Sequence, residues 1–191
     1  MMMLVLAVLS ASAAAGMRIA LPLLVISLLH GDSIWSHLPI LNQIKPQILL
    51  SILISWSLFE LSASKKLLGQ RILQIVQLFF SPIIGAIIAV TTAKILAIDF
   101  APIWLSGFLG AIFALLLTLV KVGWFFRLRG IPIGVVIIED FLSIALTFLA
   151  FEAPEEGGII ALLLLWISIR SAKAWRDWYK KPSVSISARP S

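Results

Sequence analysis

The chain has 191 residues, of which 61% are hydrophobic and 13% are charged, and its formal net charge is +6. A soluble domain is about 45–50% apolar and about 25% charged, and a protein of this size cannot hide so much apolar side chain from water. The composition therefore excludes a soluble globule, a disordered chain and a nucleic-acid-binding domain, and it predicts a protein whose solvent is the lipid bilayer. Cysteine is absent, which excludes disulfides and thiolate chemistry.

The first apolar stretch, residues 1–29, contains Gly16, Arg18 and Pro22. It is too long for one straight span and too short for two, since a span needs about 20 residues. We therefore expect a bent or broken first helix near Gly16–Pro22, a feature that is tolerated only inside protein or beside a cavity. A cleaved signal peptide is the alternative for the first 15 residues, but no basic segment precedes the apolar run.

Five more apolar stretches follow along the chain, and the last reaches about Trp175 if its basic side chains snorkel: 47–61, 72–93, 102–122, 131–151 and 158–169. They predict an all-α fold, a polytopic membrane helix bundle with about six transmembrane helices. We expect one helical domain over residues 1–178 and a basic, disordered tail over residues 179–191. With three spans in each half, any internal duplication would be a 3+3 inverted repeat.

Most of the 15 Lys and Arg residues fall on alternate connections, at 63–71, 121–130 and in the tail from residue 170. The positive-inside rule places those connections in the cytoplasm, and six spans then place both the N- and C-termini there. We expect this basic face to attract anionic lipid. A homo-oligomer or a membrane protein partner is also compatible with the sequence.

Four charged residues lie within the predicted spans, namely Arg18, Glu60, Glu139 and Asp140. A charge at a span centre costs about 2.5–3.5 kcal/mol on insertion scales, so these side chains should be paired or hydrated. Adjacent helical residues point about 100° apart, so one carboxylate of the Glu139–Asp140 pair can face Arg18 while the other faces another helix or water. The cluster is either a structural ion pair that fixes helix register or a charged site on a transport path.

Two further polar features lie near the predicted cytoplasmic side. Glu60 either reaches Lys65, Lys66 and cytoplasmic water or lines an inner gate. A polar stripe with the spacing i, i+4, i+7, i+11 occupies one helical face: Gln70, Gln74, Gln77 and Ser81. This stripe favours an amphipathic helix at the membrane interface, and lining of the bundle interior is the alternative.

No motif points to catalysis. The sequence has no P-loop, dinucleotide fingerprint or Ser/His/Asp set, and His30, Asp32 and His37 do not have the spacing of a zinc site. We expect no enzymatic activity, no cofactor and no bound metal.

Several segments are similar to one known family. Residues 14–24, 58–61, 81–86 and 136–140 resemble an uncharacterised bacterial integral membrane family, filed as domain of unknown function 4126. The resemblance spans most of residues 14–150 and implies the helical architecture, a bacterial inner or specialised internal membrane, and the importance of the matched charged positions Arg18, Glu60, Glu139 and Asp140. The family's acidic residues near positions 64, 70 and 74 are absent here, so any role for them does not transfer.

Two functions follow as hypotheses. The first is a small permease or channel for an ion or small solute that uses the mid-membrane charged residues. The second is a non-transporting scaffold or assembly factor that binds a partner protein or anionic lipid.

Overall fold

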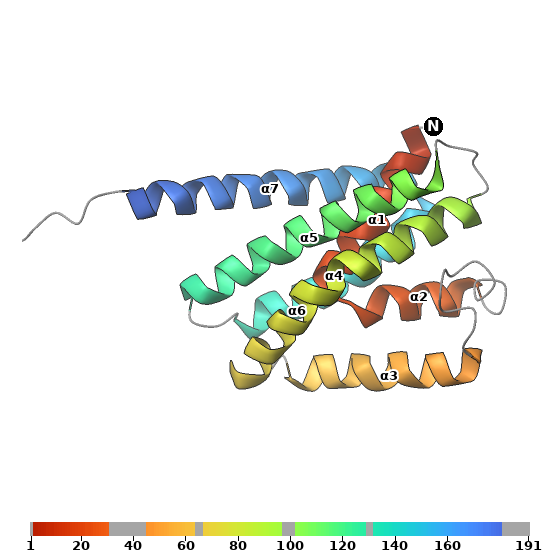
Figure 1. Ribbon diagram of the computed structural model, residues 1–191, viewed down its shortest axis with the longest axis horizontal. Coiled ribbons are helices and arrows are strands. Elements are labelled where there is room, and N and C mark those ends of the chain that lie inside the picture. The colour runs from red at the N-terminus through yellow and green to blue at the C-terminus, as the bar shows by residue number, and fades with distance from the viewer. Residues whose placement is uncertain (1, 31–44, 64–66, 97–101, 129–131, 181–191) are drawn as a thin grey trace, which may run out of the picture.

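The computed structural model describes residues 2–30, 45–63, 67–96, 102–128 and 132–180, and within them the chain is an all-α bundle (Figure 1). This architecture confirms the predicted fold class. The tail beyond Lys180 lies outside the described residues. The helices in chain order are α1 (Met2–Met17), α2 (Ala20–His30), α3 (Pro46–Ala63), α4 (Leu67–Ile95), α5 (Ile103–Leu128), α6 (Ile133–Glu152) and α7 (Pro154–Lys180).

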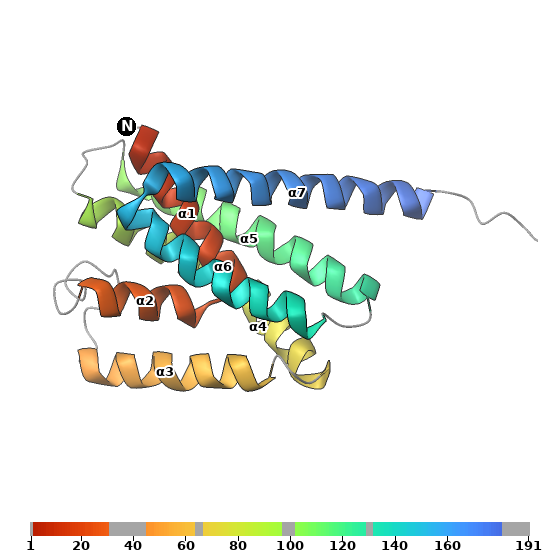
Figure 2. The same cartoon turned by 180° about the vertical axis from the view of Figure 1, so that it is seen from behind.

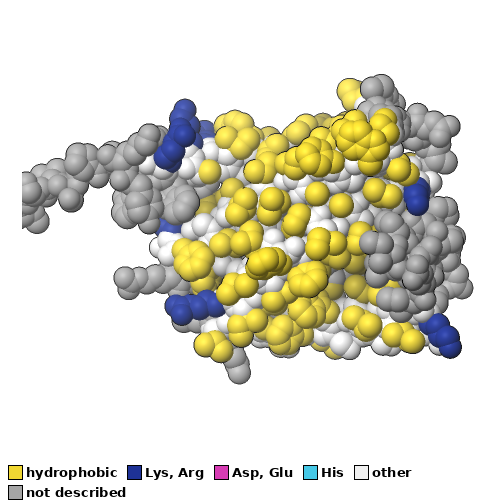
Figure 3. Space-filling model, viewed as in Figure 1, with side chains coloured by type: hydrophobic (Ala, Val, Ile, Leu, Met, Phe, Trp, Pro, Cys, Tyr) yellow, Lys and Arg dark blue, Asp and Glu magenta, His cyan; other side chains and the backbone are white. Residues whose placement is uncertain are grey.

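Three of these helices, α4, α5 and α6, contain stretches long and apolar enough to cross a membrane. The helices α1, α2 and α3 are apolar but shorter, and α7 carries two glutamates in its first turn and basic residues in its second half. On the face drawn in Figure 3, hydrophobic side chains form a broad band, and Lys and Arg side chains lie towards its two ends. The chain is therefore a membrane-embedded helix bundle, whereas a 3+3 repeat stays a prediction.

Helix α1 lies at the centre of the bundle and contacts α4, α5, α6 and α7. Its residues from Ser10 to Gly16 are all buried and small. Small residues let helix backbones approach closely in a membrane. A Cβ added to Gly16 would lie 2.8 Å from the carbonyl oxygen of Ala114 on α5, and one added to Gly157 on α7 would lie 2.5 Å from Ser10 Oγ. The Ser- and Ala-rich composition of α1 is thus what allows four helices to surround it.

The chain breaks between α1 and α2 at Arg18 and Ile19, which confirms the break predicted near Gly16–Pro22. The two helices run in opposite directions (Figures 1 and 2). Leu4 packs with Ala93 and Leu96 at the end of α4, so α1 starts at the end of the bundle where α4 finishes. Helix α2 then returns to that same end and packs against α3 and α6.

This hairpin differs from the single crossing that we expected for residues 1–29. We predicted both termini on one side because residues 1–29 were counted as a single crossing. In the structure, α1 begins at one end of the bundle and α7 finishes at the other (Figure 2). A run of 29 apolar residues has the same composition whether it crosses once or turns back, so hydropathy alone could not distinguish the two.

Candidate functional site

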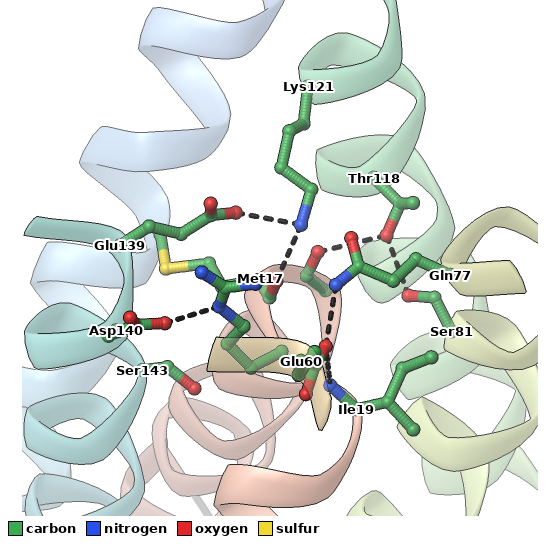
Figure 4. A network of polar contacts seen from close by, with 12 residues as sticks. Met17, Ile19, Glu60, Gln77, Ser81, Thr118, Lys121, Glu139, Asp140 and Ser143 are labelled. Atoms are coloured by element: carbon green, nitrogen blue, oxygen red, sulfur yellow. Dashed lines mark hydrogen bonds and ion pairs between the residues drawn. The ribbon is translucent and has the colours of Figure 1, made fainter. Parts of the chain in front are cut away.

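The charged side chains predicted within the spans converge at the break between α1 and α2 (Figure 4). Arg18 Nε forms an ion pair with Asp140 Oδ1 of α6. The neighbouring Glu139 faces another helix, and its Oε1 lies 2.7 Å from Lys121 Nζ of α5. The structure therefore contains the predicted pairing, in which one of two adjacent carboxylates faces Arg18 and the other does not.

Lys121 is the charged residue that sequence reasoning missed, since we assigned it to a cytoplasmic connection. It lies inside α5, which continues to Leu128, and its side chain is only 14% exposed. One signal could have placed it. Ala114, Thr118 and Lys121 follow each other at helical spacing on one face, so a helix that buries Ala114 also turns Lys121 inward.

Ala14 O accepts a hydrogen bond from the backbone nitrogen of Arg18 at 3.0 Å. The carbonyl groups that follow it lack partners within their own helix, as at any helix C-terminus. Lys121 Nζ donates to Met17 O at 2.5 Å, and Thr118 Oγ1 lies 2.9 Å from Gly16 O. Ser143 Oγ on α6 lies 3.2 Å from Ala14 O. A cation at a helix C-terminus also interacts favourably with the helix dipole. Side chains of α5 and α6 therefore cap the end of α1.

The start of α2 is matched by a carboxylate. Glu60 Oε1 accepts a hydrogen bond from Gln77 Nε2 at 2.6 Å and lies 3.5 Å from the backbone nitrogen of Ile19. The first N–H groups of a helix carry partial positive charge, so an acidic side chain is stabilised there. Glu60 is 1% exposed, which corrects the expectation that it reaches water. Lys65 and Lys66 lie outside the described residues.

The polar stripe faces the bundle interior. Gln70, Gln74, Gln77 and Ser81 are all 6% exposed or less. The opposite face of α4 carries exposed apolar side chains such as Ile75 and Phe79. The interfacial reading that the sequence favoured is therefore wrong, and the interior alternative describes this part of the chain. The spacing of the stripe correctly predicted one helical face, but spacing alone does not show whether that face contacts water or protein.

A small polar cavity with a volume of about 20 Å³ lies beside the break. That volume suffices for one or two waters or a small ion. Its lining includes Arg18, Gln74, Lys121 and Glu139. Within the described residues, Arg18 Nη2 and both amide atoms of Gln74 are buried without a hydrogen-bond partner. Such atoms cost about 1–3 kcal/mol each, so the cavity is suited to a small polar or charged occupant.

The described part of the chain contains no group of three or more His, Cys, Asp and Glu side chains that could hold a metal ion. Asp32 and His37 lie outside the described residues. The arrangement at the break consists of paired opposite charges and amides.

The family model described as "Domain of unknown function (DUF4126)" matches residues 5–174, and the chain belongs to that family. No curated protein and no solved structure matches the chain.

Proposed function

We propose that this member of the DUF4126 family is a small permease or channel for an ion or small polar solute. The observation that carries the proposal is a cavity at a broken helix that is lined by Arg18, Lys121 and Glu139. Lys121 and Glu139 pair with each other, and Arg18 pairs with Asp140. Helices that break inside the membrane are a common way to build ion and solute sites, because their ends offer unpaired carbonyl and N–H groups.

The protein's own charges occupy both ends of the break. Lys121 contacts the carbonyl end of α1, where a solute cation would bind, and Glu60 contacts the N–H end of α2, where an anion would bind. A solute in the cavity would meet the unpartnered atoms of Arg18 and Gln74 and compete with the carboxylates for the two basic side chains. We propose that the basic side chains exchange their carboxylate partners for the solute, and that this exchange couples solute binding to passage.

The site favours binding over reaction. Its functional groups are two ion pairs, a carboxylate held by an amide, and further amides. We therefore propose that the protein transforms no substrate and needs no cofactor.

We also propose that the basic end of the bundle, where α7 finishes, faces the cytoplasm of a bacterial inner or specialised internal membrane. The α1–α2 hairpin then enters from the opposite side. Because the chain has no cysteine, single cysteines can be introduced at Met3 and at Arg176 and treated in intact cells with a membrane-impermeant maleimide. We expect labelling at position 3 and protection at position 176. The reverse pattern, or equal labelling, would refute this orientation.

A scaffold or assembly role is the second candidate. The end of α7 extends beyond the other helices (Figure 1), and the second half of α7 carries the exposed basic residues Arg170, Lys173 and Arg176. Such a surface could hold a partner protein or anionic lipid. A stoichiometric partner that is lost when these three residues become Gln would favour this role over transport.

Transport is tested by reconstituting the full chain in liposomes and measuring flux of a panel of cations, anions and small neutral solutes. We expect a protein-dependent flux that Glu139→Gln or Asp140→Asn reduces at least tenfold. Glu152→Gln is the matched control, because Glu152 is an exposed acid on the same helix and should leave flux unchanged. The absence of flux across the panel, or equal loss in the control, would reject the proposal.

A further inference from the structure

A second, larger space lies on the other side of the Lys121–Glu139 pair. It has a volume of about 370 Å³ and is enclosed by α5, α6, α7 and the end of α1. Its walls are mostly apolar and include Leu117, Leu142 and Leu164. Binding sites for small molecules typically have this size and character, with a few polar groups in an apolar wall.

This space continues towards the basic end of the bundle. A neighbouring space of about 210 Å³ between α5 and α7 shares Val120 and Trp124 with it and is lined by Arg127 and Ser171. Helix α7 diverges from α5 and α6 towards that end in both views (Figures 1 and 2). We call the two spaces together the α5–α7 groove.

The groove therefore has an apolar inner part and a basic mouth. Arg127 is exposed at the mouth, and the exposed Arg170 and Lys173 follow on α7. Trp124, whose Nε1 donates to Ser171 Oγ at 2.5 Å, lies between the two parts. Tryptophan is typical of the boundary between acyl chains and head groups. From Leu117 to Arg127 the helix rises about 15 Å, which is half the thickness of the hydrocarbon core. An acyl chain of one leaflet spans that same depth.

We infer that the α5–α7 groove binds a bilayer lipid with an anionic head group, whose acyl chain lies against Leu117, Leu142 and Leu164 and whose phosphate contacts Arg127. Charge complementarity selects this occupant over a neutral lipid, since each basic residue near an anionic head group attracts it and lacks that attraction for a head group without net charge. The inference does not require transport. Lipid binding at this groove and solute passage at the polar cavity can each be true without the other.

A lipid bound in the groove would also lie next to the charged site. The groove wall includes Lys121 and Glu139, which also line the polar cavity. Their ion pair thus belongs both to the wall of a space suited to an acyl chain and to the wall of a space suited to water or an ion. A bound chain would shield this pair from the groove side and strengthen it, because charges interact more strongly where water is excluded.

The test is native mass spectrometry of the full chain in detergent micelles, titrated with phosphatidylglycerol or with phosphatidylcholine that has the same acyl chains. We expect the first phosphatidylglycerol to bind at least tenfold more tightly than the first phosphatidylcholine. Arg127→Gln should weaken phosphatidylglycerol binding about fivefold and leave phosphatidylcholine binding unchanged. The matched control is Arg71→Gln, which removes an exposed arginine of α4 that does not line the groove.

A second pair of variants tests the acyl-chain part without changing charge. Ile167→Trp adds bulk to the groove wall and should weaken binding of both lipids at least fivefold, whereas Ile169→Trp adds the same bulk to an exposed position of α7 that does not line the groove. Equal affinity for the two lipids, equal effects of the variant and its control, or occupation of the groove by a second copy of the chain would overturn the inference.

Discussion

The middle of α1 and its C-terminal end are held by different physical means. Around the middle, neighbouring helices approach so closely that glycine is required. A Cβ on Gly110 of α5 would lie 2.8 Å from Ser12 Oγ and 2.6 Å from the carbonyl oxygen of Gly85 on α4. At the C-terminal end, side chains of α5 also form hydrogen bonds to the carbonyl groups of α1, from Lys121 and Thr118.

The comparison distinguishes residues that stabilise the bundle from residues that we assign to function. Close packing of small residues stabilises a helix in a membrane without charges, so the middle of α1 needs no charged partner. The broken end carries charges from α3, α5 and α6, each costly in hydrocarbon, although an unbroken helix would have needed none of them for its backbone. This difference is why we place function at the break.

The largest expected effect comes from breaking the Arg18–Asp140 pair. Asp140→Ala leaves a buried arginine without its ionic partner, which should lower the free energy of unfolding by about 3–5 kcal/mol in mixed micelles. The double variant Arg18→Met with Asp140→Leu removes both charges and should recover most of that loss. Glu152→Ala, an exposed change on the same helix, should change stability by less than about 0.5 kcal/mol. If the double variant is less stable than Asp140→Ala, the pair is not what holds Arg18.

The next effect tests the close packing around the middle of α1. Gly110→Val forces a side chain against the backbone of α4 and should destabilise the protein by about 1–3 kcal/mol, or prevent folding. Gly123→Val is the matched control, because it adds the same side chain to the same helix at a position where a Cβ would meet nothing within 4 Å. The folded yield and the unfolding midpoint of the two variants should therefore differ clearly. Similar values would show that α4 and α5 are not in close contact at Gly110.

The smallest effect concerns a single cap. Thr118→Val keeps the shape of the side chain but removes the hydroxyl near Gly16 O and Ser81 Oγ, and should cost about 1 kcal/mol. Thr91→Val is the control, because that hydroxyl contacts the Ile87 carbonyl of its own helix. We expect Thr91→Val to cost less than Thr118→Val in the same unfolding assay, and the opposite order would count against capping of α1 by α5.

Much of the fold follows from the sequence because the bilayer leaves few alternatives. Hydropathy indicates the apolar helices, and a stretch that contains Gly16, Arg18 and Pro22 in 29 apolar residues must bend or break. The contact between Arg18 and Asp140 was also predictable, since an unpaired charge at that depth is expensive.

The remaining features depend on direction and on neighbours, which periodicity does not encode. The return of α2 to the end where α1 began could not be predicted, because both paths bury the same residues. Lys121 was assigned to a loop because basic residues mark span ends. Its inward position follows from the spacing to Ala114 and Thr118 only once α5 is known to continue to Leu128. Gln74 and its neighbours form a polar face, but only the presence of α1 and α5 beside it, with Glu139 of α6 across the polar cavity, makes that face an interior one.

A double-mutant cycle between Lys121 and Glu139 tests the central claim that charged groups from separate helices meet at the break. Lys121→Met, Glu139→Gln and the double variant are compared by their free energies of unfolding in the same micelles, with Lys94→Met replacing Lys121→Met as a distant control on α4. We predict a coupling of at least about 1 kcal/mol for the Lys121–Glu139 cycle and additivity within about 0.5 kcal/mol for the control cycle. Additivity in both cycles would contradict the ion pair and, with it, the charged site.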